Sequence, residues 1–148
     1  MLTKSHWAHL IPHRGAMCLL DAVVAHDADR LHARTASHRS GDNPLRSDNV
    51  LHALHLCEYG AQAMAVHGAL LAQAAGSRAS PGVLVSLRAV QLHAARIDDL
   101  PGDLDVYAER LLASATSWQY AFRVEHVGVP LAQGRAAVMV APVTGETE

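Results

Sequence analysis

Three polar side chains recur along one side of an otherwise apolar segment, and their types suit acid–base chemistry. His55, Glu58 and Gln62 stand at positions i, i+3 and i+7, a spacing that places them on one face of an α-helix. A carboxylate among apolar residues must be neutralised, hydrogen bonded or exposed in a cleft, because burying it alone is costly. The pattern is therefore compatible with a general acid at Glu58 that an apolar pocket keeps protonated. The plainer alternative, which the spacing alone favours, is an exposed helix face or a structural hydrogen bond.

Other kinds of chemistry find less support in the sequence. The chain has eleven histidines, and His52, His55 and Glu58 follow one another at steps of three. Successive steps of three drift around a helix, and no His-Glu-x-x-His or comparable ligand spacing occurs, so we expect no metal site. The sequence also lacks the nucleophile elbow of serine hydrolases and a glycine-rich phosphate loop.

The three polar residues belong to a long segment with the features of a helix. Asp48 or Asn49 is the expected N-cap, and Gly76 is the expected stop. A helix of about 26 residues would span about 39 Å at 1.5 Å per residue. Because apolar residues cover nearly its whole circumference, we expect this helix to be buried on all sides.

Six strand-like stretches accompany the helix, two before it and four after it. They are residues 17–27, 31–37, 83–93, 104–113, 118–126 and 131–142. One buried helix among six strands predicts an α+β domain in which an antiparallel sheet wraps around the helix. Such a sheet leaves edge strands, which are often paired across a two-fold axis, so we expect a dimer.

Composition and charge limit the class of protein. At 148 residues, half of them hydrophobic, the chain is long enough for one domain with its own core. A net charge of −2 offers no electrostatic footprint for nucleic acid or an anionic membrane. The two cysteines, Cys18 and Cys57, cannot form a disulfide framework and are interpreted as buried free thiols. No signal peptide or uninterrupted membrane span is visible, so we expect a soluble, cytoplasmic protein.

Two motifs resemble those of 3-hydroxyacyl-ACP dehydratases with the hotdog fold. Residues 10–21, Leu-Ile-Pro-His-Arg-Gly-Ala-Met-Cys-Leu-Leu-Asp, resemble the Pro-His-Arg…Leu-Leu-Asp opening of that family. Residues 58–62, Glu-Tyr-Gly-Ala-Gln, resemble its Glu-x-x-Ala-Gln signature on the central helix. The motifs occur in the family's order, and the similarity is greatest to the dehydratase-like subunits of aryl polyene biosynthesis. The resemblance covers essentially the whole chain and implies a single hotdog domain over residues 1–148.

The resemblance implies roles for the residues that match these motifs. Glu58 would protonate the departing 3-hydroxyl group, while a histidine on a loop of the neighbouring subunit removes the proton alpha to the thioester. Gln62 would hold backbone or orient Glu58, and His55 would either tune Glu58 or be a satisfied core or groove histidine. His13 is expected to be structural, near the floor of the site. Arg14 would steer a phosphopantetheine phosphate or form a structural ion pair.

The same resemblance implies the partners of the protein. The substrate would be a thioester on acyl carrier protein or coenzyme A, with no other cofactor, and the product would be a trans-2-enoyl thioester. A backbone N–H near residues 50–52 would stabilise the enolate-like oxygen. The subunits would form a homodimer or a heterodimer with another hotdog chain.

The sequence departs from the family pattern at the loop that carries the histidine. The Gly-His-Phe-Pro motif is missing, and residues 37–44 read Ser-His-Arg-Ser-Gly-Asp-Asn-Pro. His38 is the candidate base, although it precedes Glu58 by twenty residues, more than in the family; the alternative is a surface histidine at a strand end. Two other functions therefore stay open. One is a non-catalytic or half-active partner subunit of a hotdog heterodimer, and the other is an acyl thioesterase in which Glu58 activates water.

Overall fold

The computed structural model describes residues 1–77 and 82–140, so the end of the predicted 131–142 strand lies outside the described residues. The elements before the long helix are β1 (Leu2–Thr3), α1 (Lys4–Trp7), β2 (Ala22–His26), β3 (Arg30–Thr35) and four short 3-10 turns, η1 (Ala8–Leu10), η2 (Gly15–Met17), η3 (Ser37–Arg39) and η4 (Ala53–His55). The remaining elements are α2 (Leu56–Ala74), β4 (Gly82–Leu92), β5 (Leu104–Ala113), β6 (Ser117–His126) and β7 (Val129–Val140).

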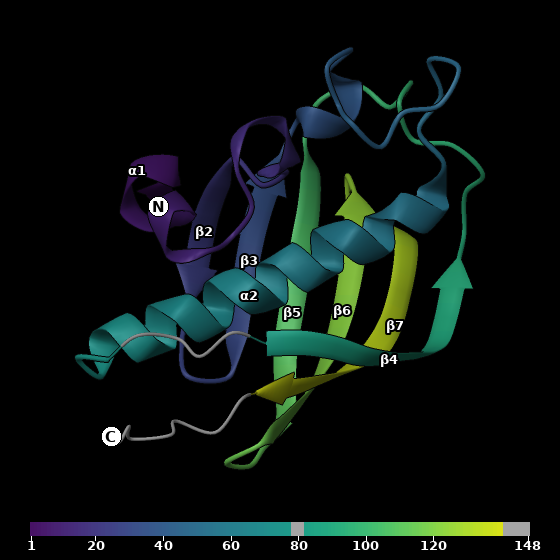
Figure 1. Cartoon of the computed structure of the whole chain (residues 1–148). Coiled ribbons are helices and arrows are strands. Elements are labelled where there is room, and N and C mark those ends of the chain that lie inside the picture. Colours follow the sequence, from purple (N-terminus) through teal and green to yellow (C-terminus); the bar gives the residue numbers. More distant parts are fainter. Residues whose placement is uncertain (78–81, 141–148) are drawn as a thin grey trace.

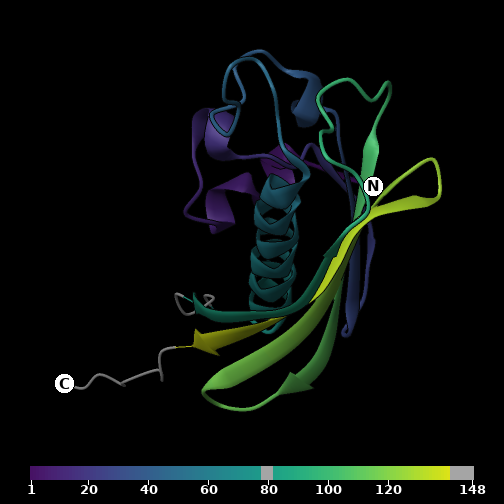
Figure 2. The ribbon, with the colours of Figure 1, turned by 90° about the vertical axis from the view of Figure 1, so that its right-hand side faces the viewer.

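All strands belong to one antiparallel sheet that curves around α2 (Figures 1 and 2). Their order is β1-β2-β3-β5-β6-β7-β4, so β4 forms one edge. Val127 and Gly128 join β6 to β7 in a two-residue hairpin, and both have the positive φ that such a turn requires. The predicted α+β architecture, an antiparallel sheet around one long helix, is confirmed, with the two-residue β1 as an addition.

The core lies between α2 and the concave face of the sheet. Gly60 brings the helix against β6, because a Cβ atom at this position would stand 2.6 Å from the ring of Phe122. Only glycine permits an approach this close. The helix contributes these buried apolar side chains to the core: Leu56, Tyr59, Ala63, Met64, Val66, Ala69 and Leu70.

The helix begins later than the sequence predicted. Asp48 and Asn49 do not cap it; both have positive φ, and they close a tight turn in which Ser47 and Val50 exchange two backbone hydrogen bonds of 2.9 Å. Aspartate and asparagine favour helix caps and also tolerate the left-handed conformation, so the same residue types serve both structures. The α-helix has 19 residues instead of about 26. Its predicted end is confirmed, since Gly76 has a φ of +73° and the Ser77 N–H returns to the Ala72 carbonyl oxygen at 2.8 Å.

The first predicted strand, residues 17–27, is also too long. Only Ala22–His26 joins the sheet, and Gly15–Met17 forms a 3-10 turn. The Met17 carbonyl and the Leu19 N–H bind a helix side chain, Gln62, instead of a neighbouring strand. Apolar character alone cannot distinguish these two ways of satisfying a buried backbone.

The prediction that the helix is buried on all sides is wrong for the single chain. Leu54 and Glu58 are exposed, and Ala61 and Ala65, which lie on the same side, are only partly buried. We call this side, Leu54, Glu58, Ala61 and Ala65, the open face of the helix. Apart from one carboxylate it is made of alanine and leucine, so its sequence pattern is that of a buried face.

Candidate active site

Gln62 fastens the first family-like motif to the second. Its side chain is fully buried, Oε1 accepts a hydrogen bond from the Leu19 N–H at 2.9 Å, and Nε2 donates to the Met17 carbonyl oxygen. The amide thus pairs with the backbone of residues 17–19 as a neighbouring strand would. Gln62 thus binds backbone atoms, and no hydrogen bond within the described residues connects it to Glu58.

Glu58 lies in the first turn of α2 and is the only acidic residue of that helix. Its carboxylate is exposed and makes no hydrogen bond or ion pair with any residue of the described ranges 1–77 and 82–140. In the single chain it therefore points away from the core, on the open face. The environment that would keep it protonated, an apolar pocket, is not supplied by this chain alone.

His38 is buried, which excludes the surface histidine that was the alternative interpretation. It lies in η3, and its Nε2 is 3.0 Å from the Leu100 carbonyl oxygen. A carbonyl oxygen only accepts, so Nε2 carries the proton and Nδ1 bears the lone pair. Burial lowers the pKa of His38 and keeps the ring neutral. However, Nδ1 is itself covered by protein and has no hydrogen-bond partner within the described residues.

A chain of hydroxyl groups ties the histidine turn to the start of the helix. The Asn43 side-chain amide donates to the Tyr59 hydroxyl at 3.0 Å, and that hydroxyl lies 2.9 Å from Ser37 Oγ. Ser37 Oγ donates its own proton to the Leu19 carbonyl oxygen at 2.7 Å, so Tyr59 is the donor toward Ser37. Ser37 precedes His38, and Tyr59 follows Glu58. This network, which the sequence did not reveal, fixes the two candidate segments relative to each other.

The other predicted site residues are dispersed. His13 is half-buried, with an Nδ1 that has no partner in the described part of the chain. Arg14 is exposed and makes no ion pair within the described residues. His55 closes η4 directly before the helix and is partly buried. None of the three is hydrogen bonded to Glu58.

The backbone near residues 50–52 is largely occupied by folding contacts. The Val50 N–H donates to Ser47, and the Leu51 N–H donates to Asp98 Oδ1, each at 2.9 Å. Arg96 pairs with the same carboxylate, and the two contacts hold the pKa of Asp98 well below its usual range. Two of the three N–H groups expected for an oxyanion are therefore engaged in positioning the entry to the helix.

His67 of α2 is fully buried, and both of its ring nitrogens have partners. Its Nε2 is 2.9 Å from the Asp27 carbonyl oxygen, and its Nδ1 is 2.7 Å from the Tyr120 hydroxyl. Because the carbonyl accepts, Nε2 carries the proton and Nδ1 accepts from the tyrosine. In the neutral ring, both nitrogens of His67 therefore have hydrogen-bond partners.

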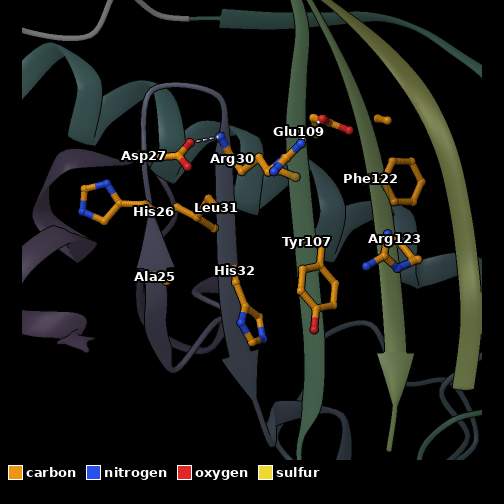
Figure 3. Close-up of a pocket in the computed structure, with 12 residues that line it drawn as sticks. Ala25, His26, Asp27, Arg30, Leu31, His32, Tyr107, Glu109, Phe122 and Arg123 are labelled. Carbon is orange, nitrogen blue, oxygen red and sulfur yellow. Dashed lines mark hydrogen bonds and ion pairs between the residues drawn. The ribbon is translucent and has the colours of Figure 1, made fainter. Parts of the chain in front are cut away.

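Two surface hollows lie apart from Glu58 and His38. The larger, about 570 Å³, lies on the outer face of β2, β3, β5 and β6, where His32 stacks on Tyr107 and Arg123 covers the same ring (Figure 3). The smaller, about 310 Å³, lies between the N-terminal segment and the loop after β3, and Cys18, Ser37 and Asn43 belong to its lining. Neither hollow is lined by Glu58 or His38. Within the described residues, no group of three or more His, Cys, Asp or Glu side chains could hold a metal ion.

Comparison with known proteins identifies the family. The sequence matches the ApeP-like family, described as ApeP dehydratase, over residues 5–147. The chain belongs to the ApeP-like dehydratase family. No curated protein matches the sequence.

Solved structures agree with this assignment of the ApeP-like chain at the level of the fold. A chain of the dehydratase heterocomplex ApeI:P from Xenorhabdus doucetiae superposes with a TM-score of 0.82 at 21% identity, covering 93% of this chain and 91% of that one. Zebra fish thioesterase superfamily member 2 gives a TM-score of 0.63 at 15% identity and covers 95% and 100%. A hypothetical thioesterase with coenzyme A from Streptococcus pneumoniae gives 0.58 at 13%, covering 81% and 84%. The hotdog fold is thereby confirmed. No helix in the described part of this chain has the length and apolar character needed to cross a membrane.

Proposed function

We propose that this chain is one half of a dehydratase that converts 3-hydroxyacyl thioesters to trans-2-enoyl thioesters, on acyl carrier protein or coenzyme A. Membership of a dehydratase family supports the reaction class. The observation that carries the proposal is the position of Glu58, a single carboxylate on an otherwise apolar helix face that its own chain leaves uncovered. A second subunit placed over this face would desolvate the carboxylate and favour its protonated form.

The chemistry assigned to Glu58 follows from what dehydration requires. A base removes the proton alpha to the thioester carbonyl, and the 3-hydroxyl group leaves as water only if it receives a proton. A carboxylic acid held in an apolar cavity supplies that proton. Glu58 meets the requirement once the open face is covered, because no group within the described residues competes for its oxygens.

The sheet edge offers a route by which a second subunit would cover the open face. Among the described residues, β4 is hydrogen bonded to β7 alone, and its far side is unpaired. Most of its side chains are apolar yet exposed, with Val83 at 62%, Val85 at 55% and Leu87 at 41% of their accessible area. An exposed, apolar edge strand of 11 residues is a template for strand pairing. The similarity to a chain of a dehydratase heterocomplex supports a second hotdog subunit as the partner.

The geometry of His38 favours an active site that is completed by a second subunit over one that this chain forms alone. Its lone pair, on Nδ1, is sealed inside the chain, and its N–H is held by the Leu100 carbonyl oxygen. A base must reach the carbon-bound proton of the substrate, and in this conformation Nδ1 does not reach the surface. We therefore propose that the partner subunit supplies the base that works with Glu58, and that His38 of this chain has a structural role.

The test is dehydration measured by enoyl absorbance with 3-hydroxyacyl thioesters, using the chain alone and with a co-expressed hotdog partner. Glu58→Gln should lower turnover of the complex at least about a hundredfold, as expected for a missing general acid, while circular dichroism stays unchanged. Glu109→Gln, the same chemical change on the outer sheet face, is the matched control and should retain full turnover. Unchanged turnover of the Glu58→Gln variant would contradict the proposal that Glu58 is the general acid.

Two further readouts separate the alternatives. His38→Ala should change turnover by less than about tenfold if the partner supplies the base; a loss of about a hundredfold or more would make His38 the base instead. Release of free thiol without enoyl formation would identify an acyl thioesterase and contradict dehydration. The same samples serve for both measurements.

A further inference from the structure

Two arginines face each other at the open edge of the sheet. Arg88 of β4 and Arg135 of β7 are register partners in the β4–β7 ladder. Both are exposed, and they lie on the outer face, because Gly134 and Ala136 on either side of Arg135 are buried against the core. Side chains directly opposite each other on antiparallel strands have Cβ atoms about 5 Å apart. Two arginine side chains therefore leave the outer face of the sheet from directly opposite positions.

This arrangement is unfavourable in the single chain. Like charges directly opposite each other destabilise a strand pair, and arginine stays charged at every physiological pH. Other outer-face arginines have carboxylate partners: Arg30 pairs with Glu109 at 3.2 Å, and Arg123 pairs with Glu125. Within residues 1–77 and 82–140, no ion pair joins Arg88 or Arg135 to a carboxylate. The positive charges of Arg88 and Arg135 would therefore have to be balanced by a strand that pairs with β4.

The two edge strands of a second copy offer no carboxylate that could balance this charge. β4 reads Gly-Val-Leu-Val-Ser-Leu-Arg-Ala-Val-Gln-Leu and β7 reads Val-Pro-Leu-Ala-Gln-Gly-Arg-Ala-Ala-Val-Met-Val, with no aspartate or glutamate in either strand. Whatever the register, two copies paired through β4 would offer Arg88 no carboxylate from the adjoining two strands. Arg88 is one residue from the middle of β4, so pairing about a central two-fold axis would also bring two arginine pairs close together.

We propose that the Arg88–Arg135 pair selects the partner of this chain. It disfavours a second copy and favours a different hotdog subunit whose edge strand presents an acidic residue on the outer face. The inference rests on the proposed function only in taking the partner to be a hotdog subunit. Exposed charges of this kind contribute little to the affinity of the right partner but discriminate against wrong ones, because juxtaposed like charges are penalised.

The test is a charge exchange between two copies of the full chain. Wild type, the R88E/R135E double variant and their equimolar mixture are titrated by analytical ultracentrifugation, and native mass spectrometry distinguishes mixed dimers from self-dimers. We expect the mixed dimer to be at least about tenfold tighter than either self-dimer at low salt. The preference should shrink in about 1 M salt, where the Debye length is about 3 Å. Equal affinities in all three samples would overturn the proposal.

Single variants provide the matched control and a safeguard against misfolding. Arg88→Gln and Gln119→Glu each lower the net charge by one, and both positions lie on the outer face, but Gln119 belongs to β6, two strands from the edge. Arg88→Gln should strengthen self-association several-fold, whereas Gln119→Glu should leave it unchanged. If the double variant does not fold, R88E mixed with wild type replaces it. A wild-type self-dimer as tight as that of Arg88→Gln would contradict the inference.

The outcome is independent of the proposed reaction. Glu58→Gln leaves β4 and β7 intact, so loss or retention of dehydration in that variant does not change the association measurements. A mixed-dimer preference without any dehydration would preserve the inference about the edge and reject the proposed function. Full dehydration with equal association in all samples would preserve the proposed function and reject the inference about the edge.

Discussion

Replacing Gln62 tests whether one buried amide joins the two family-like motifs. Gln62→Ala removes the partners of the Leu19 N–H and the Met17 carbonyl, and Leu19 is fully buried. A buried backbone group left without a partner costs about 1–3 kcal/mol, and the vacated side-chain volume adds a cavity cost. We expect the free energy of unfolding to fall by about 3–5 kcal/mol, a large part of the 5–15 kcal/mol typical of a domain.

Urea unfolding followed by far-UV circular dichroism measures the change. With a slope of about 2 kcal/mol per molar urea, the midpoint should fall by about 2 M while the slope stays constant. Gln62→Met separates the two contributions, because methionine retains most of the volume but makes neither hydrogen bond; it should still cost about 2–4 kcal/mol. Gln73→Ala, at an exposed position of the same helix, is the control and should cost under about 0.5 kcal/mol. A cost of Gln62→Met no larger than that of the control would refute the reasoning.

Two further predictions concern pH and close packing. Burial lowers the pKa of His67, so the unfolded chain takes up this proton before the native chain does, and the free energy of unfolding should fall as the pH drops below about 6.5, by up to about 1.4 kcal/mol per pH unit. Urea titrations at several pH values should show a smaller slope for His67→Gln and an unchanged slope for His26→Gln, an exposed histidine; equal slopes would contradict the assignment. Gly60→Ala should cost about 1–3 kcal/mol, because its Cβ would meet the Phe122 ring at 2.6 Å. Gly41→Ala, with no heavy atom within 4 Å of the added Cβ, should cost under about 0.5 kcal/mol, and a similar cost for both would contradict the packing argument.

The parts of the fold that the sequence predicted well are those set by local pattern. β5 runs over the predicted residues 104–113, because alternating side chains follow a Pro-Gly turn. The end of α2 was predicted from Gly76, whose left-handed conformation is a property of the residue itself. In both cases the deciding interactions lie within a few residues of the position.

The parts that failed depend on contacts with distant residues. Asp48 and Asn49 suit a helix cap or a left-handed turn equally well, and the entry to the helix is fixed instead by Asp98, 47 residues after Leu51. His38 looked like a loop residue, but it is buried through a contact with Leu100, 62 residues later. Periodicity describes one segment at a time, so it carries no information on such pairs.

In the candidate site too, local features could be predicted from the sequence, whereas features set by distant contacts could not. The spacing of His55, Glu58 and Gln62 correctly indicated a helix, yet the three residues end in different environments: partly buried, exposed and fully buried. The i, i+3, i+7 stripe is broad enough to cross from the open face to the side of the helix that packs against residues 17–19. The spacing therefore picked out Gln62 and Glu58, and the family resemblance suggested that Gln62 holds backbone. Neither revealed that Glu58 would be exposed in the single chain.

Glu58 and the Arg88–Arg135 pair place different requirements on the proposed partner subunit. As the proposed general acid, Glu58 requires a second subunit that covers the open face and excludes water from the carboxylate. The edge strand that would recruit the subunit carries two positive charges that a second copy of this chain cannot neutralise. A different chain with an acidic residue at its own edge is the partner proposed above, and it would satisfy both. The proposed acid calls for a second subunit, and the proposed charge selection disfavours a second copy, so the two proposals are consistent although they concern different elements of the fold.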